Sequence, residues 1–442
     1  MSLLVLNLAA FWLPFFWVNL ANTAVLLEYA EVQHYYLVLF IFEKSMKTVN
    51  EAIEFLVSQA KVSEVVESRS LAQALGCVLA QDVRSPVNVP PHDNSMMDGY
   101  AINRADIQPG LVVNVSQRIP AGSAPQALQT GTAARIFTGA PIPAGANAVV
   151  MQEMAQASEA GVVFETLPQA GENIRRCGED IAADSIILKA GQRLRPQDLA
   201  LIASVGQAAV AVFKPLTLVT FTTGDELLQP GQAPQAGKIY NSNHTLLNTL
   251  VAQLGFNWVD LGQVEDTLAA TQETLKKAAS LGDVIITTGG VSVGEEDHIK
   301  PAVESLGSLS MWQVKMKPGK PLAFGEVLGK AFLGLPGNPV SAFTTFNLFA
   351  RPFLLAMQGA KDLTPKSVWV SADFDWLKPG FRREFVRARL ENQQQTSYAQ
   401  LYHHQGSGVL TSTVWAEGLV VIPEDRVIHR GDKVEYISFD VF

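Results

Sequence analysis

Acidic residues and glycines gather where two apolar runs of the sequence end. "LTLVTFTT" (216–223) is followed by Gly224, Asp225 and Glu226, and "DVIITTGG" (283–290) continues into "VSVGEEDHI". Carboxylates bind hard divalent cations, which prefer oxygen ligands, and consecutive glycines leave backbone N–H groups open to an anion. We therefore expect a cation and a phosphate-type ligand at these turns. The alternative is that the acids only cap helices or face solvent.

A third turn adds positive charge. "KMKPGKP" (315–321) concentrates three lysines around a Pro-Gly pair, in a chain whose formal net charge is -9. Shortly after it, in "GLPGNPVSAF" (334–343), Asn338 is placed to cap a helix and Pro339 to begin it. Lysines and the amino end of a helix both attract anions. With the carboxylates, these turns predict a site for a phosphate or oxyanion substrate held with a cation.

Other chemistries find little support in the sequence. There is no Walker loop and no G-x-G-x-x-G fingerprint, which disfavours a nucleoside triphosphatase and a nicotinamide enzyme. Cys77 and Cys177 are the only cysteines, without metal-ligand spacing, so we expect neither zinc nor a disulfide framework, and a reducing cytoplasm. A pI of about 5.4 gives no indication of nucleic-acid binding.

The elements that carry these turns alternate between strand and helix. The runs at 216–223, 283–290 and 331–335 are continuous, apolar and β-branched, as in strands buried on both faces of a parallel sheet. "HTLLNTLVAQLG" predicts a helix between the first two. Residues 214–363 are thus predicted to form an open α/β sheet, whose ligands bind beyond the carboxyl ends of the strands.

The rest of the chain predicts three further parts. Apolar residues at helical spacing over residues 51–81, among them Val65, Leu71 and Leu75, together with "PQDLALIASVG", predict a discontinuous helical domain at 46–83 and 184–213. Brief β-rich runs predict a small inserted β domain at 84–183. The alternating strands of 364–442 predict a C-terminal β barrel, with a sandwich as the alternative.

The first 45 residues differ from the rest in composition. Residues 1–27 contain no charged side chain, which is typical of a membrane helix, but prolines and asparagines interrupt the run. Met46 reads as a natural start, because Thr48 and Glu51 have the spacing of a helix capping box. We expect residues 1–45 to lie outside the native fold and no membrane partner, with a membrane anchor as the alternative.

Seven blocks of the sequence resemble one known family. In order they are "DNSMMDGYA", "RIFTGAPIP", "NIRRCGEDI", "TTGDEL", "TTGGVSVGEEDHI", "KPGKPLAFG" and "GLPGNPVSA". They resemble the MoeA family of molybdopterin molybdenumtransferases, which includes the E domain of gephyrin. The resemblance begins near residue 46 and implies insertion of molybdate into adenylylated molybdopterin with release of AMP, the last step of molybdenum cofactor biosynthesis.

The resemblance also implies an assembly, a cofactor and partners. Such enzymes are elongated cytoplasmic homodimers in which two subunits meet across the active cleft, and they use Mg²⁺. The expected partners are the adenylyltransferase that supplies the substrate and the acceptor molybdoenzymes. A molybdopterin adenylyltransferase with the same type of α/β domain, and a non-enzymatic gephyrin-like scaffold, are the alternatives.

Site residues follow from the matched blocks, position by position. The implied catalytic residues are Asp98, Thr138, Asp180, Glu226, Asp266 and Asp297, with Glu226 and Asp297 holding the metal. The implied substrate-binding residues are Gly289, Gly290, Ser292, Gly294, Lys317, Lys320, Pro336, Pro339, Arg387 and Ser407.

The sequence departs from the family pattern at three positions. Gln313 stands where some members carry Lys, and Lys315 is placed to substitute for it. His92 and Met96 replace the more usual Phe and Ala beside the first block.

Overall fold

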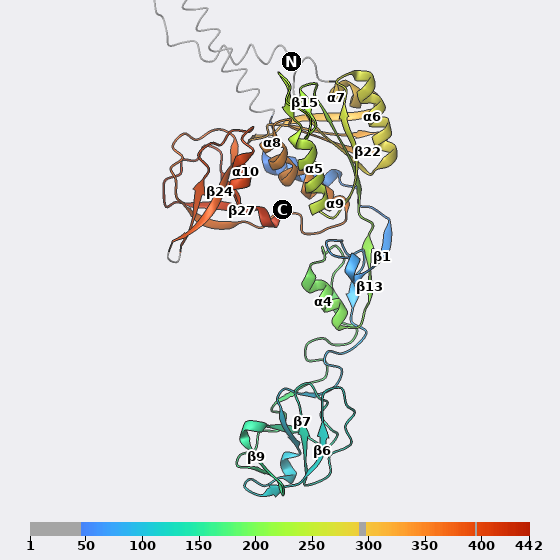
Figure 1. Ribbon diagram of the computed structural model, residues 1–442, viewed down its shortest axis with the longest axis vertical. Coiled ribbons are helices and arrows are strands. Elements are labelled where there is room, and N and C mark those ends of the chain that lie inside the picture. The colour runs from blue at the N-terminus through green and yellow to red at the C-terminus, as the bar shows by residue number, and fades with distance from the viewer. Residues whose placement is uncertain (1–45, 291–297, 394–395) are drawn as a thin grey trace, which may run out of the picture.

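The computed structural model describes residues 46–290, 298–393 and 396–442. The predictions for residues 1–45, and those for Ser292, Gly294 and Asp297, lie outside these ranges. The chain forms an elongated body, with an α/β unit and a barrel at one end and a small β unit at the other (Figure 1). A narrow unit of strands and one helix connects the two ends.

The α/β unit is built on a six-stranded mixed sheet. Its order is β17 (Asn257–Val264), β14 (Thr217–Thr223), β18 (Val284–Thr288), β22 (Lys330–Leu335), β21 (Pro321–Val327) and β19 (Gly307–Gln313). The first four strands are parallel, and β21 and β19 are antiparallel to their neighbours. The three strands predicted from apolar runs are confirmed as β14, β18 and β22, adjacent in the sheet. Their carboxyl ends therefore meet at one edge.

Both faces of this sheet are covered by helices. One face packs on α3 (Val49–Gln59), α5 (Ser242–Gln253), α8 (Pro339–Thr345) and α9 (Arg351–Met357), and the other on α6 (Leu268–Leu281) and α7 (Ile299–Leu306). Successive strand residues face opposite sides, so Leu218 joins the first core and Val219 the second. Each such side chain contributes roughly 1.5–3 kcal/mol when buried, which explains the unbroken apolar runs.

The helix containing α8 and α9 runs through the protein core. The two are joined by a π-helical turn at Phe346–Ala350. Among the described residues, the run Pro339–Met357 is the one helix long and apolar enough to cross a membrane, and 83% of it is buried inside the protein. Its apolarity is therefore that of a core helix.

The C-terminal unit is a closed barrel, as predicted. Its strands are β24 (Arg383–Gln393), β25 (Thr396–Leu401), β23 (Val368–Ala372), β27 (Lys433–Ser438) and β26 (Gly418–Ile422), and pairing of β24 with β26 closes it. A short strand of the α/β unit, β20 (Met316–Lys317), pairs in parallel with the start of β24. This pairing joins the lysine-rich turn to the barrel.

The connecting unit corrects one prediction. The helix expected over residues 51–81 ends at Gln59, and β1 (Val66–Ser70) then pairs antiparallel with β13 (Ala209–Phe213). Val65 and Leu75 are 56% and 57% exposed, so the apolar spacing did not mark one buried helix face. α3 instead packs on the α/β unit, and its capping box of Thr48 and Glu51 is confirmed.

The remaining elements of this unit agree better with the sequence. β2 (Val83–Arg84) pairs with β12 (Ile186–Leu188). α4 (Pro196–Ser204) begins at the predicted proline, and Gly206 follows it with φ 80°. The unit is therefore as much strand as helix.

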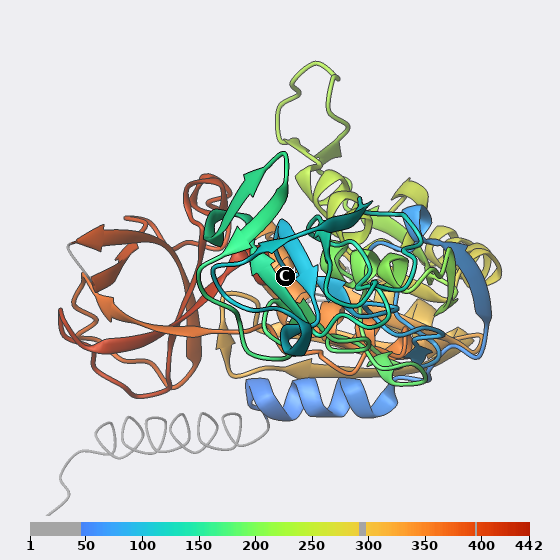
Figure 2. The same ribbon diagram turned by 90° about the horizontal axis from the view of Figure 1, so that it is seen from below.

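The small β unit contains two main sheets, and side chains from both form one shared core. The first has the order β6 (Val115–Ile119), β7 (Ala133–Ile136), β4 (Gly99–Ile102) and β8 (Ala148–Met151). The second has the order β5 (Val112–Val113), β10 (Gly161–Phe164) and β9 (Ala155–Ser158). The loop that precedes Asp98 contains β3 (Asn94–Ser95), which pairs antiparallel with β11 (Ile174–Arg175). Seen along the long axis, this unit lies in front of the others (Figure 2).

Candidate active site

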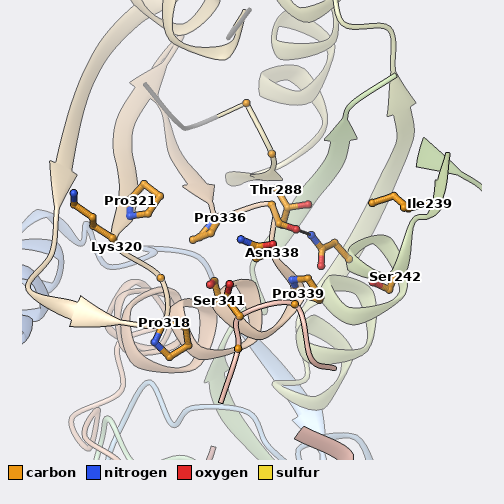
Figure 3. A pocket seen from close by; sticks show the side chains of 18 of the residues that line it. Ile239, Ser242, Thr288, Pro318, Lys320, Pro321, Pro336, Asn338, Pro339 and Ser341 are labelled. Carbon is orange, nitrogen blue, oxygen red and sulfur yellow. Dashed lines mark hydrogen bonds between the residues drawn. The ribbon is translucent and has the colours of Figure 1, made fainter. Parts of the chain in front are cut away.

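A cavity of about 870 Å³ lies beyond the carboxyl ends of β14, β18 and β22. Figure 3 shows its lining side chains, which come from strand ends, the lysine-rich turn and the start of α8. The loop of residues 405–408, from the barrel, forms another wall. The volume is in the range that holds a small-molecule ligand.

Eight of the predicted site residues line this cavity together. They are Glu226, Gly289, Gly290, Lys317, Lys320, Pro336, Pro339 and Ser407. They come from segments up to 180 residues apart in the chain, so the fold gathers what the motifs only suggested.

The glycines after β18 have a steric reason. Gly289 has φ 88°, and a Cβ there would lie 2.9 Å from the carbonyl oxygen of Thr223, at the end of the neighbouring strand. The N–H of Gly289 donates to the carbonyl of Leu335, at 3.2 Å. Gly290 follows with φ 61°. Glycine is thus required for β18 to leave the sheet beside β14, and it keeps this wall of the cavity free of side chains.

The lysine-rich turn is anchored on the barrel. Lys317 Nζ lies 2.9 Å from a carboxylate oxygen of Glu384, whose side chain is 9% exposed. The N–H of Val314 donates to the carbonyl of Lys320 at 2.9 Å and closes the turn. Lys320 is half-buried, and it lies at one edge of the cavity lining (Figure 3).

The described lining is cationic overall. Lys317, Lys320 and Arg382 stand against one acid, Glu226. Because the chain as a whole is acidic, this local excess favours an anionic ligand.

The amino end of α8 corrects a second prediction. The helix begins at Pro339, as expected, but the side chain of Asn338 makes no capping bond. The N–H of Val340 instead donates to the carbonyl of Ser407 at 3.1 Å. The barrel loop therefore takes the role of the cap, and this bond sets Ser407 against the cavity.

Arg387 does not line the cavity. It is 1% exposed, and its guanidinium donates to Ser412 Oγ at 3.0 Å and to the carbonyl of Gly406 at 3.1 Å. Burial lowers its pKa to about 10. Its backbone also exchanges hydrogen bonds with the Gln405 side chain. Arg387 therefore holds the 405–408 loop in place from behind.

Sequence reasoning missed several lining residues, among them Arg382 and the two asparagines at the start of α5. Asn241 caps α5 by accepting from the N–H of His244 at 3.1 Å, and it donates to Thr222 Oγ1 at 2.8 Å. Asn243 donates to the carbonyl of Gly337 at 2.7 Å, and its buried Oδ1 has no hydrogen-bond partner. The signal available was "YNSNHT", a capping sequence directly before a helix.

Asp98 and Thr138 lie together, but in the small β unit. One carboxylate oxygen of Asp98 accepts from the backbone N–H of Thr138 at 2.8 Å and from its hydroxyl at 3.0 Å. These bonds lower the pKa of Asp98, the backbone bond most. Gly99 follows because a Cβ there would lie 1.9 Å from the carbonyl oxygen of Val150. The result is an ionised carboxylate in a defined position on the surface.

Asp180 and Asp266 also lie away from the cavity lining. Asp180 is exposed beside a smaller hollow of about 300 Å³ that Pro90 and Arg175 help to line. Asp266 follows β17 just before α6 begins. Within one chain, Asp98, Thr138 and Asp180 thus occupy the end of the body opposite the cavity (Figure 1).

The departures from the family pattern lie in two places. His92 and Met96 are exposed on the loop before Asp98. Gln313 ends β19, and its buried Oε1 has no hydrogen-bond partner. Lys315 lies two residues further on, where its carbonyl accepts from the N–H of Arg383 at 3.0 Å.

The described residues fit a magnesium ion only with help from the substrate. No group of three or more His, Cys, Asp or Glu side chains among them is arranged to hold a metal. Mg²⁺ is commonly bound by one or two carboxylates together with substrate phosphates. Glu226, the single acid of the described lining, suits that arrangement.

An open α/β sheet with a cationic cavity at its carboxyl edge defines a binding domain for an anionic small molecule. Residues 219–356, which hold this sheet and much of the cavity, match the family model "Probable molybdopterin binding domain". Residues 47–206 match the MoeA N-terminal region (domains I and II), and residues 370–439 match the MoeA C-terminal region (domain IV). The chain belongs to the MoeA family.

Individual relatives agree with this assignment over most of the chain. A molybdopterin molybdenumtransferase of Haemophilus influenzae is 37% identical over 400 residues, which cover 89% of this chain and 99% of the relative. Molybdopterin molybdenumtransferase 2 of Mycobacterium tuberculosis is also 37% identical, covering 81% and 91%. The crystal structure of a molybdopterin biosynthesis MoeA protein from Pyrococcus horikoshii is 30% identical, with a TM-score of 0.76 and coverage of 89% and 100%.

Proposed function

We propose that this chain is an enzyme that inserts molybdate into adenylylated molybdopterin and releases AMP, the last step of molybdenum cofactor biosynthesis. The observation that carries the proposal is the cationic cavity at the carboxyl edge of the sheet, in a chain that belongs to the MoeA family. Both expected substrates, a pyrophosphate-linked pterin and an oxyanion, suit such a cavity.

The lining suggests how the substrates bind. The backbone at Gly289 and Gly290 carries no side chains and so allows a pyrophosphate to approach closely. Lys320 and Arg382 are placed to neutralise the pterin phosphate and molybdate. Ser407, held against α8, adds a hydroxyl on the barrel side.

The reaction breaks the phosphoanhydride bond that joins AMP to the pterin phosphate, while an oxygen of water or of molybdate forms the new bond to phosphorus. Negative charge develops on the departing phosphate oxygen, and fixed cations near that oxygen lower the barrier. Lys320 lines the cavity beside the lysine-rich turn and is the side chain that we assign to this role. Glu226 and Asp297 would hold Mg²⁺, which supplies further positive charge at the phosphate oxygens when bound.

We infer that the complete site is shared by two subunits of a homodimer. Thr138 orders the carboxylate of Asp98 in the small β unit, and among the described residues Asp98 does not line the first cavity of its own chain. Asp98 of the partner subunit would complete the cavity of the first chain. This arrangement accounts for both the elongated shape and the exposed acids.

The test is an assay for molybdate-dependent AMP release. Purified protein is incubated with adenylylated molybdopterin, Mg²⁺ and molybdate, and AMP is followed over time. We expect AMP to form only when molybdate is present. ATP consumption with molybdopterin would instead identify an adenylyltransferase, and absence of both reactions would favour a scaffold.

The cellular setting follows from this reaction. We expect a cytoplasmic enzyme that receives its substrate from an adenylyltransferase and passes its product to molybdoenzymes. Co-purification of the protein with either partner is the measurement that checks this expectation.

A further inference from the structure

A second cavity, of about 700 Å³, lies at the joint between the connecting unit and the α/β unit. Its walls come from residues 75–76, from the segment that leads into α4, from the carboxyl end of α5, and from Arg351 and Asp362. Figure 1 shows α4 below α5 and α9, with this joint between them. None of its lining residues belongs to the first cavity.

This joint cavity is lined by three arginines and one acid. The arginines are Arg193, Arg195 and Arg351, and the acid is Asp362. Arg195 is matched by Asp198, which lies 2.9 Å away. For Arg193 and Arg351 the lining therefore offers one carboxylate, that of Asp362. Asp362 is exposed, so water screens its attraction for the two arginines.

Arg351 is buried without full compensation. It is 8% exposed, and it donates to the carbonyls of Leu363 at 3.2 Å and Val441 at 3.0 Å. Its Nε is buried and has no hydrogen-bond partner among the described residues. Burying a guanidinium is costly unless its charge is paired and its N–H groups are bonded, so the site is short of an anion.

Arg193 also has neutral hydrogen-bond acceptors. Its guanidinium donates to the backbone carbonyls of Gly76 and Leu254, each at 3.1 Å, and among the described residues no ion pair joins it to an acidic side chain. Arg193 and Arg351 line the same cavity, so an anion between them would relieve the cost of burying both. The pKa values agree with this placement, because burial lowers the pKa of Arg193, and burial together with the charge of Arg193 lowers the pKa of Arg351 to about 10.

We propose that the joint cavity binds a small molecule carrying a phosphate group, with the phosphate between Arg193 and Arg351. Guanidinium groups suit phosphate because they present several donors in one plane. The volume exceeds that of a phosphate alone, and Leu75, Leu194 and Ala252 offer apolar walls for an organic portion. A nucleoside monophosphate and free phosphate share the required chemistry.

Helix α5 connects the joint cavity to the first one. Its first residues, Ser242 and Asn243, line the first cavity, and Gln253 at its end lines the joint. A helix of 12 residues is about 18 Å long. The two cavities are thus separate sites at opposite ends of one rigid element.

The experiment titrates the full chain with inorganic phosphate and with AMP by calorimetry. It uses Lys320→Ala as the background, because that change weakens the first cavity. We expect binding to persist there, to weaken at least tenfold in Arg193→Gln, and to return in part in Arg193→Lys. If AMP binds more tightly than phosphate, the cavity recognises the organic portion as well. If the two bind equally, the cavity recognises the phosphate group alone.

Asp362→Asn is the variant that keeps the test decisive. Asp362 is exposed, so its loss leaves the core intact, and removing the one opposing charge in the lining is expected to tighten binding several-fold. The proposal is overturned if neither phosphate nor AMP binds in the Lys320→Ala background. Equal affinity in the Arg193→Gln and Asp362→Asn variants would overturn it as well, even if Arg193→Gln lowers stability.

Discussion

The first cavity and the Asp98 loop carry matched family motifs, but they are built in different ways. The cavity is enclosed by strand ends, a lysine-rich turn and a barrel loop from three parts of the chain. Asp98 is a surface carboxylate that two hydrogen bonds from Thr138 hold in place. The first cavity resembles a complete binding site, whereas the Asp98 loop presents one candidate catalytic group outside that cavity.

This difference supports the proposal that the two regions act together across a subunit boundary. A carboxylate ordered for chemistry needs a substrate, and the cavity contains only one acid among its described residues, Glu226. In a symmetric dimer each chain would supply a cavity to one site and Asp98 to the other. The following changes test that division of roles, from the largest expected effect to the smallest.

Lys320→Ala should nearly abolish turnover. Loss of one fixed donor from a developing oxyanion typically lowers the rate by about 10²–10³-fold, and we expect a loss of that size in molybdate-dependent AMP release. Lys300→Ala, on α7 and outside the cavity lining, is the control and should retain normal rates. Normal AMP release by the Lys320 variant would remove the cavity from the proposed mechanism.

Mixing two inactive variants should restore activity. Asp98→Asn spoils the loop and Lys320→Ala the cavity, so a mixed dimer contains one intact site. Random exchange of subunits should return about a quarter of normal activity, measured as AMP release after co-refolding. The double variant in one chain is the control. If the mixture stays inactive while dimers form, the two regions do not share a site.

Arg387→Gln should loosen the wall of the cavity and the barrel together. It removes buried bonds to Ser412 and Gly406, at a cost of about 2–4 kcal/mol in the free energy of unfolding. Urea denaturation measures this loss. Arg389→Gln, on the same strand with a side chain 39% exposed, should cost less than about 1 kcal/mol. Equal losses in the two variants would argue against a special role for Arg387.

Thr138→Val should change only the pH dependence of the reaction. The hydroxyl of Thr138 helps to lower the pKa of Asp98, so the carboxylate survives to lower pH in the native protein. Without that hydroxyl the pKa rises, and the acidic limb of the rate profile should move to higher pH. Thr138→Ser keeps the hydroxyl and should leave the profile in place. An unmoved limb in the Val variant would mean that Asp98 does not set it.

The sequence was most informative where side-chain pattern and local geometry agree. The strands β14, β18 and β22 were predicted because residues buried on both faces of a sheet must be apolar throughout. The helix starts at Thr48 and Pro196 were predicted from capping chemistry. Both signals depend on neighbours in the chain alone.

Prediction failed where distant segments decided the outcome. Residues 66–70 lie inside the run that was expected to be helical, yet they pair with Ala209–Phe213, some 140 positions away, as a strand. Asn338 stands at a helix start, but the carbonyl of Ser407 takes the bond that its side chain was expected to make. In each case a long-range hydrogen bond replaced the local one.

The sequence by itself determined which side chains the cavity has available, because its glycines, lysines and carboxylates stand in motifs that local sterics and charge explain. Only the tertiary structure decided which of them meet. The fold gathered Glu226, Lys320 and Ser407 at one edge of the sheet and buried Arg387 behind the 405–408 loop. It placed Asp98 in the small β unit, at the opposite end of the elongated body. The reason is physical: strand order and barrel closure depend on pairing between remote segments, which no short stretch of sequence encodes.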